Sequence, residues 1–288
     1  MKIRITLAAI SLMVGLTACQ KEISSELIDP NNPSNPNNQG NIDGELLVKA
    51  LEITPATGDT NVITVEYDAS KRMVKYLSKG KVNGVNTNII YTFNRATDGK
   101  VQSIKLVSDF GTSFDSTLFY PYYQTGSNRL AYIKSTSSVG GFDITDSSVI
   151  TYNAAGRVIR KESFQEALGI ALPGSRIDFT YDANGNITVI ANSSDAGGGI
   201  YVEGSRFTYT YNGHKAAVQG GDEFFIIMAV TTVSPNDITR VDLETAAGDG
   251  TTILSNQTYN SFDRPSKANA SVTGPGGSYN LRFEYYYQ

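Results

Sequence analysis

The chain has 288 residues and a formal net charge of −4, with 17 tyrosines, 27 glycines, one cysteine, one histidine and no tryptophan. A mildly acidic chain lacks the clustered positive charge that nucleic acids and anionic lipid headgroups require, so neither is an expected partner. Abundant tyrosine and glycine are typical of strands joined by tight turns.

Residues 1–18 have the layout of a secretory signal peptide, with two basic residues followed by an apolar run too short for a permanent membrane helix. The run ends in a motif that resembles the lipobox of bacterial lipoproteins: Leu16, Thr17, Ala18 and Cys19. The resemblance implies cleavage before Cys19 and acylation of its sulfur and new amino terminus. The alternative is an ordinary secretory signal that contains a cysteine by chance. Because Cys19 is the only cysteine, it has no disulfide partner within the chain, which favours lipidation.

The residues after Cys19 bear on the location of the protein. Gln20, Lys21 and Glu22 resemble the export signal that sends some lipoproteins of Gram-negative bacteria to the cell surface. We therefore expect a protein that is lipid-anchored in the outer membrane and displayed on the cell surface, with the periplasmic face as the alternative.

Residues 19–44 are expected to form a lipidated tether. The segment is rich in Asn, Pro and Ser and is too polar to form a packed core. As a flexible coil it would span on the order of 25–30 Å. Residues 45–288 are then a single domain.

The domain is built from a repeated β-hairpin motif, which is clearest at residues 179–187 (FTYDANGNI). A strand with alternating apolar residues ends in Tyr, then Asp or Asn, two variable residues, a turn residue, a polar residue and a new strand. Four strict copies start at Tyr67, Tyr152, Tyr181 and Tyr259, and looser copies start at Phe93, Tyr123 and Tyr211, the last shortened to an Asn-Gly turn. The spacing near 29 residues predicts one hairpin per repeat.

Seven hairpins, with residues 47–53 as a first strand and 279–287 as a last one, predict an all-β antiparallel meander of about sixteen strands. A sheet this wide curls into a closed or partly open barrel. We expect its apolar rows to face inward, because several arms are too polar for a belt facing lipid.

Two segments depart from this pattern. Residues 224–230 (FFIIMAV) are continuously apolar, and the stretch 222–233 predicts a short helix that plugs the barrel or, alternatively, a buried strand. Residues 164–172 are a second candidate for a short helix.

The repeats resemble the tyrosine–aspartate repeats of Rhs-type toxin shells and teneurins, although Lys71 and Asp263 stand where the pattern has Gly. The whole layout of lipobox, tether and hairpins more closely resembles a family of uncharacterised bacterial lipoproteins with a porin-like fold. That resemblance implies a fold, but no activity and no catalytic residues.

No catalytic, cofactor or metal site is expected. His214 is expected to be a turn residue, because one histidine without a cysteine would need several carboxylates to hold zinc. Asp182 and its neighbours only faintly resemble a calcium loop, which requires a further bidentate acid. The expected function is non-enzymatic binding or scaffolding by a monomer that holds a small apolar or glycan ligand. The alternatives are a carboxylate-based glycan-active enzyme and a lipid-embedded β-barrel.

Overall fold

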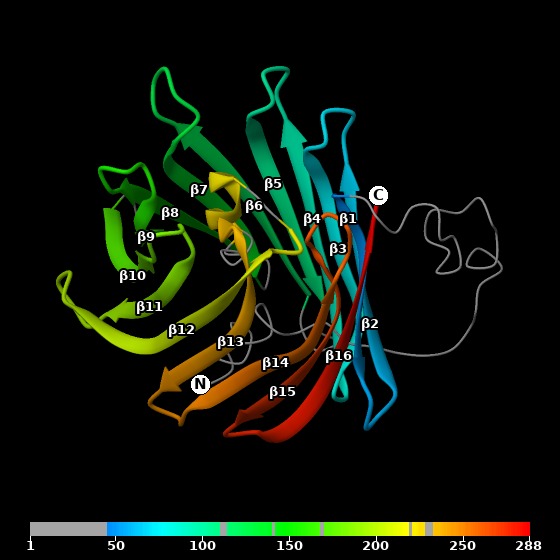
Figure 1. The fold of residues 1–288 in the computed structure, drawn as a ribbon. Helices are drawn as coiled ribbons and strands as arrows, with labels where there is room; N and C mark the ends of the chain where they lie inside the picture. The colour runs from blue at the N-terminus through cyan, green and yellow to red at the C-terminus, as the bar shows by residue number, and fades with distance from the viewer. Residues whose placement is uncertain (1–44, 110–113, 140–141, 168–169, 219–220, 228–232) are drawn as a thin grey trace.

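The computed structural model describes residues 45–288 except 110–113, 140–141, 168–169, 219–220 and 228–232, and in this part sixteen antiparallel strands close into one barrel (Figure 1). The strands are β1 (Leu47–Thr54), β2 (Asp59–Tyr67), β3 (Met73–Val82), β4 (Val85–Arg95), β5 (Val101–Asp109), β6 (Phe114–Tyr123), β7 (Leu130–Val139), β8 (Phe142–Tyr152), β9 (Val158–Ala167), β10 (Ile170–Tyr181), β11 (Ile187–Asp195), β12 (Tyr201–Lys215), β13 (Asn236–Thr245), β14 (Gly250–Tyr259), β15 (Pro265–Gly274) and β16 (Gly277–Tyr287). They follow chain order around the ring, and β16 pairs with β1 to close it. The expected meander is confirmed, and the barrel is closed.

The repeated turns lie at one end of the barrel, and their chemistry explains the repeat. The Asp or Asn side chain accepts hydrogen bonds from backbone N–H groups of its own turn, as Asp68 does from Ser70 and Arg72 at 2.8 and 3.0 Å. The fourth turn residue after the tyrosine has a positive φ, which is 79° at Gly156 and 95° at Gly185. Lys71 and Asp263 adopt the same conformation at 61° and 65°, so the non-glycine copies keep the same turn.

The repeated tyrosines tie neighbouring hairpins together at this end. The hydroxyl of Tyr181 donates to the backbone carbonyl of Val158, the first residue of an earlier strand, at 2.6 Å, and Tyr287 at the end of the last strand donates in the same way to Pro265 at 2.7 Å, whereas Tyr259 donates to Asp237. Tyr67, Tyr123 and Tyr211 make the same bond, to Leu47, Val101 and Ile187. The tyrosine therefore sets the distance between successive hairpins.

The two faces of the wall differ, although Tyr122, Tyr132 and Val149 are exposed on the outer face. Apolar side chains on inward positions form one buried cluster, which includes Tyr91, Phe93 and Phe207, so the expected inward orientation of the apolar rows is confirmed. Outward positions carry cross-strand ion pairs. Lys75 pairs with Glu66 at 2.7 Å, and Arg160 pairs with Asp178 at 2.6 Å.

A short plug fills the barrel at the end that carries the repeated turns. A 3₁₀ helix, η3 (Asp222–Phe225), follows β12, and the side chains of residues 224–227 are buried among the inward rows. The ring of Phe225 packs edge-on against Phe179 with centroids 5.1 Å apart. In Figure 1 this yellow segment lies inside the ring of strands. The expected short helix is confirmed over the described part of 222–233.

Two expectations about local structure are wrong. The described residues of 164–172 are strand and not helix, because β9 and β10 pair through them, with Phe164 opposite Pro173 and Gln165 opposite Leu172. The Asn-Gly pair after Tyr211 is not a hairpin turn, since β12 continues to Lys215. The register shift there shows that the extra residues form a bulge against β13.

The two ends of the described domain meet beside the plug. Leu46 and Gln288 exchange backbone hydrogen bonds of 3.2 and 3.0 Å, so the described chain begins and ends at the plugged end of the barrel. The signal peptide, Cys19, the residues flanking it and the tether lie outside the described residues. Within the described ranges, no helix is long and apolar enough to cross a membrane.

Candidate binding cavity in the barrel lumen

A cavity of about 390 Å³ lies inside the barrel against strands β6 to β10. A ring of sixteen strands is too wide for its own side chains to fill. The volume falls within the range of small-molecule sites, roughly 300–1,000 Å³. The cavity is therefore large enough to hold a small ligand.

Four serines give the cavity wall its character. They are Ser135 on β7, Ser148 on β8, Ser163 on β9 and Ser175 on β10. Ser148 and Ser163 lie opposite each other and their hydroxyls are 2.9 Å apart. Small inward side chains leave open space, and each hydroxyl can both donate and accept a hydrogen bond.

Lys161 lies at the deep end of the cavity, next to the plug. Its side chain is only 8% exposed, and its Nζ donates to the carbonyl oxygen of Phe225 at 3.3 Å. It makes no ion pair with a carboxylate of the described residues. Burial lowers the pKa of Lys161 from its ordinary value of 10.5 to about 8, because the charged form loses its hydration.

Polar and apolar groups surround the serines. Asp146 and Gln165 lie opposite each other on β8 and β9, and Phe119 and Ile133 supply apolar surface. Burial, assisted by the nearby Glu166, raises the pKa of Asp146. Leu172 is opposite Gln165 and is 49% exposed, so the cavity opens toward the end of the barrel away from the plug.

The opposite wall of the lumen has larger side chains. Tyr76 and Tyr91 pack edge to face there, with centroids 6.1 Å apart. Glu52 on β1 is completely buried, and neither carboxyl oxygen has a hydrogen-bond partner among the described residues. Burial raises its pKa well above the ordinary value. A second, smaller cavity of about 220 Å³ lies beside the plug, lined among others by Tyr67, Arg95 and Glu223.

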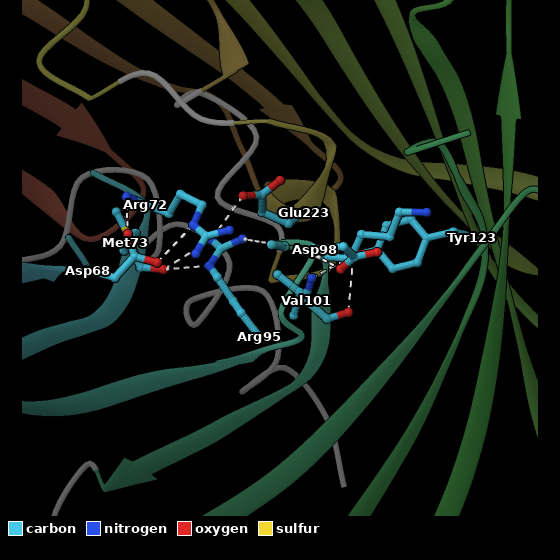
Figure 2. A network of polar contacts seen from close by, with 10 residues as sticks. Asp68, Arg72, Met73, Arg95, Asp98, Val101, Tyr123 and Glu223 are labelled. Carbon is cyan, nitrogen blue, oxygen red and sulfur yellow. Dashed lines mark hydrogen bonds and ion pairs between the residues drawn. The ribbon is translucent and has the colours of Figure 1, made fainter. Parts of the chain in front are cut away.

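The plug that floors the cavity is fastened to the rim by an arginine (Figure 2). The guanidinium of Arg95 donates to the carbonyl of Met73 at 3.0 and 3.2 Å and to that of Gly99 at 3.1 Å. Its Nη2 also contacts Glu223 Oε1 of η3 at 3.2 Å. Figure 2 shows Arg95 between the rim and the plug. This arrangement holds η3 against the wall.

His214 and Asp182, the two side chains considered above as possible metal ligands, lie outside the cavity. The Nδ1 of His214 is 2.6 Å from Asp263 Oδ1, and its ring stacks on Tyr259 at 3.7 Å. The two oxygens of Asp182 accept hydrogen bonds from Asn186 within their own turn. Across the described ranges, no group of three or more His, Cys, Asp and Glu could hold a metal.

The sequence did not reveal the cavity residues. The serines and Lys161 come from β7, β8, β9 and β10, and their shared inward position depends on pairing across these four strands. Register shifts, such as that between Pro173 and Ser175, break the simple alternation. The one usable signal in the sequence was the polarity of the arm at residues 135–140, which contains Ser135.

Among solved structures, the chain is similar to a porin-like protein from Bacteroides uniformis, with a TM-score of 0.52 and 11% identity over 84% of this chain and 98% of that one. A porin-like protein from Bacteroides vulgatus gives a TM-score of 0.39 and 11% identity over 85% and 99% of the two chains. The first of these likenesses supports the barrel fold. No family model matches the sequence, and no curated protein matches it.

Proposed function

We propose that this protein is a non-enzymatic binding lipoprotein, anchored in the outer membrane through Cys19, whose barrel holds a small hydroxylated ligand of the glycan class. The observation that carries the proposal is the serine-lined cavity next to the plug. Serine hydroxyls, an amide and a carboxylate match the alternating donors and acceptors of a sugar, while Phe119 and Ile133 suit its apolar faces.

The plug favours binding over conduction. A porin-like barrel with a polar, open lumen conducts solutes, whereas buried residues of η3 occupy one end of this lumen. The opposite end, near the exposed Leu172, is then the entrance for a ligand. The cavity therefore holds a ligand and does not conduct it through the barrel. The likeness to porin-like proteins concerns the barrel architecture alone.

The outer face favours a barrel surrounded by water and attached by its lipid. Charged pairs occupy outward positions on strands around the barrel: Lys75 with Glu66, Arg160 with Asp178, Arg206 with Glu203, and Arg240 with Asp242. A charged side chain facing lipid at the bilayer midplane costs about 2–4 kcal/mol for Arg or Lys. The described chain begins at the plugged end, where Leu46 and Gln288 exchange hydrogen bonds, so its N-terminal connection does not lie at the open end.

Filling the cavity with a larger side chain should weaken the binding of a sugar ligand. Ser135→Phe places a ring into the open space, whereas Thr136→Phe places the same ring on the outer face of the same strand. In calorimetric titrations of the full chain with a panel of neutral and acidic mono- and disaccharides, Ser135→Phe should lose at least tenfold in affinity. Thr136→Phe should bind as the wild type does. Equal binding by both variants would place the ligand elsewhere.

Replacing Cys19 by Ala tests the anchor. The variant should fold as before yet leave the membrane fraction, because acyl chains contribute about 0.8 kcal/mol per buried CH₂ and a polar tether contributes none. Metabolic labelling with a fatty-acid analogue should mark the wild type and miss the variant. Retention of the variant in membranes would indicate a second anchor and favour the lipid-embedded barrel.

A further inference from the structure

The deep end of the cavity presents a positive charge that pairs with no carboxylate among the residues that the structure describes. Lys161 is buried, lines the cavity, and bonds only to the uncharged carbonyl of Phe225 among the described residues. A methionine would fill the same space without burying a charge. An unpaired buried charge in a cavity is typical of a functional site.

The charges of the cavity are also ordered along its length. Lys161 lies opposite Ile150, and Asp146 lies four residues earlier on β8, about 13 Å nearer the open end. An anion near the open end would meet the Asp146 carboxylate, whereas an anion at the deep end would meet the ammonium. The geometry therefore orients a ligand with its negative group toward the plug.

We infer that the ligand is acidic, and that a carboxylate, phosphate or sulfate on it pairs with Lys161 while its hydroxyl groups bond to the serines. This inference rests on the proposed function and specifies its ligand class. Ser163 is two residues from Lys161 on the same face of β9, so one sugar-sized molecule can reach both. Lys161 acts here as an anion-binding residue with no covalent step.

The test compares matched sugars on the full chain at pH 7. The probes are D-galactose, D-galacturonate, D-galactose 6-phosphate and inorganic phosphate, titrated calorimetrically into the wild type, Lys161→Met and Lys105→Met. Lys105 is an exposed lysine on the outer face of β5 and serves as the control. In the wild type and in Lys105→Met, at least one acidic sugar should bind at least tenfold more tightly than galactose. Lys161→Met should lose this preference while retaining its weak binding of galactose.

Each outcome separates this inference from the proposed function. Equal affinity of the wild type for neutral and acidic sugars overturns the inference and leaves the sugar site standing. Binding of inorganic phosphate as tightly as galactose 6-phosphate, lost in Lys161→Met, supports the charge pairing and refutes the hydroxyl contacts. No binding of any probe overturns both. A melting temperature of Lys161→Met above that of the wild type shows that this variant is folded.

Discussion

Phe225→Ala should lower the free energy of unfolding by about 3–5 kcal/mol, since removing a buried aromatic ring loses its transfer free energy and leaves a cavity. Phe225 is 2% exposed and packs against Phe179 on the inner wall. At roughly 2–4 °C per kcal/mol, the melting temperature should fall by about 10 °C.

The matched control is Phe262→Ala. Phe262 is 40% exposed in the turn between β14 and β15, so its removal should change the melting temperature little. Differential scanning calorimetry of both variants gives the comparison. If Phe225→Ala melted with the wild type, η3 would not be docked in the lumen, and the cavity would lack its floor.

Lys161→Met should raise the free energy of unfolding at pH 7 by about 3 kcal/mol. A pKa lowered from 10.5 to about 8 in the folded protein corresponds to this difference between the charged and neutral forms. The unfolded chain binds more protons at this site between these two values, so the wild type becomes more stable as pH rises through that window. The advantage of Lys161→Met should therefore be complete below pH 8 and nearly vanish above pH 10.5.

Chemical denaturation of the two proteins between pH 7 and pH 10.5 measures this difference directly. Lys105→Met controls for the other groups that titrate in the same window, because its side chain is exposed. A wild type that matched Lys161→Met at every pH would mean that the ammonium has a counter-charge in the fold. A buried charge that lowers the free energy of unfolding is expected where the residue is retained because it binds a ligand.

The architecture could be predicted from sequence because each hairpin carries its own signals. Tyr181, Asp182 and Gly185 encode a hydrogen bond to a neighbouring strand, a capped turn and a positive φ within five residues. Sixteen such arms leave closure as the way to pair both edges. The plug at residues 224–227 was predictable from its unbroken apolar run, which no wall strand with one polar face could use.

The cavity could not be predicted, because it depends on the registers of four strands rather than on any local motif. Ser135, Ser148, Ser163 and Ser175 are unremarkable singly and meet only through cross-strand pairing. Bulges shift the inward positions, and the same effect turned an apparent Asn-Gly hairpin after Tyr211 into a continued strand. Local propensity also misassigned residues 164–172, where pairing on both sides prevails over helix preference.

The position of a bound ligand on the protein is the most direct test of binding in the barrel lumen. Isoleucine δ1-methyl NMR spectra of the full chain, recorded with increasing D-galacturonate, report on Ile133 in the cavity and on Ile253, which is 44% exposed on the outer face. Ile133→Val and Ile253→Val assign the two signals. If the ligand binds in the lumen, the Ile133 methyl signal shifts to saturation and the Ile253 methyl signal stays unchanged. A shift confined to Ile253 or to other outward methyl groups would contradict binding in the lumen.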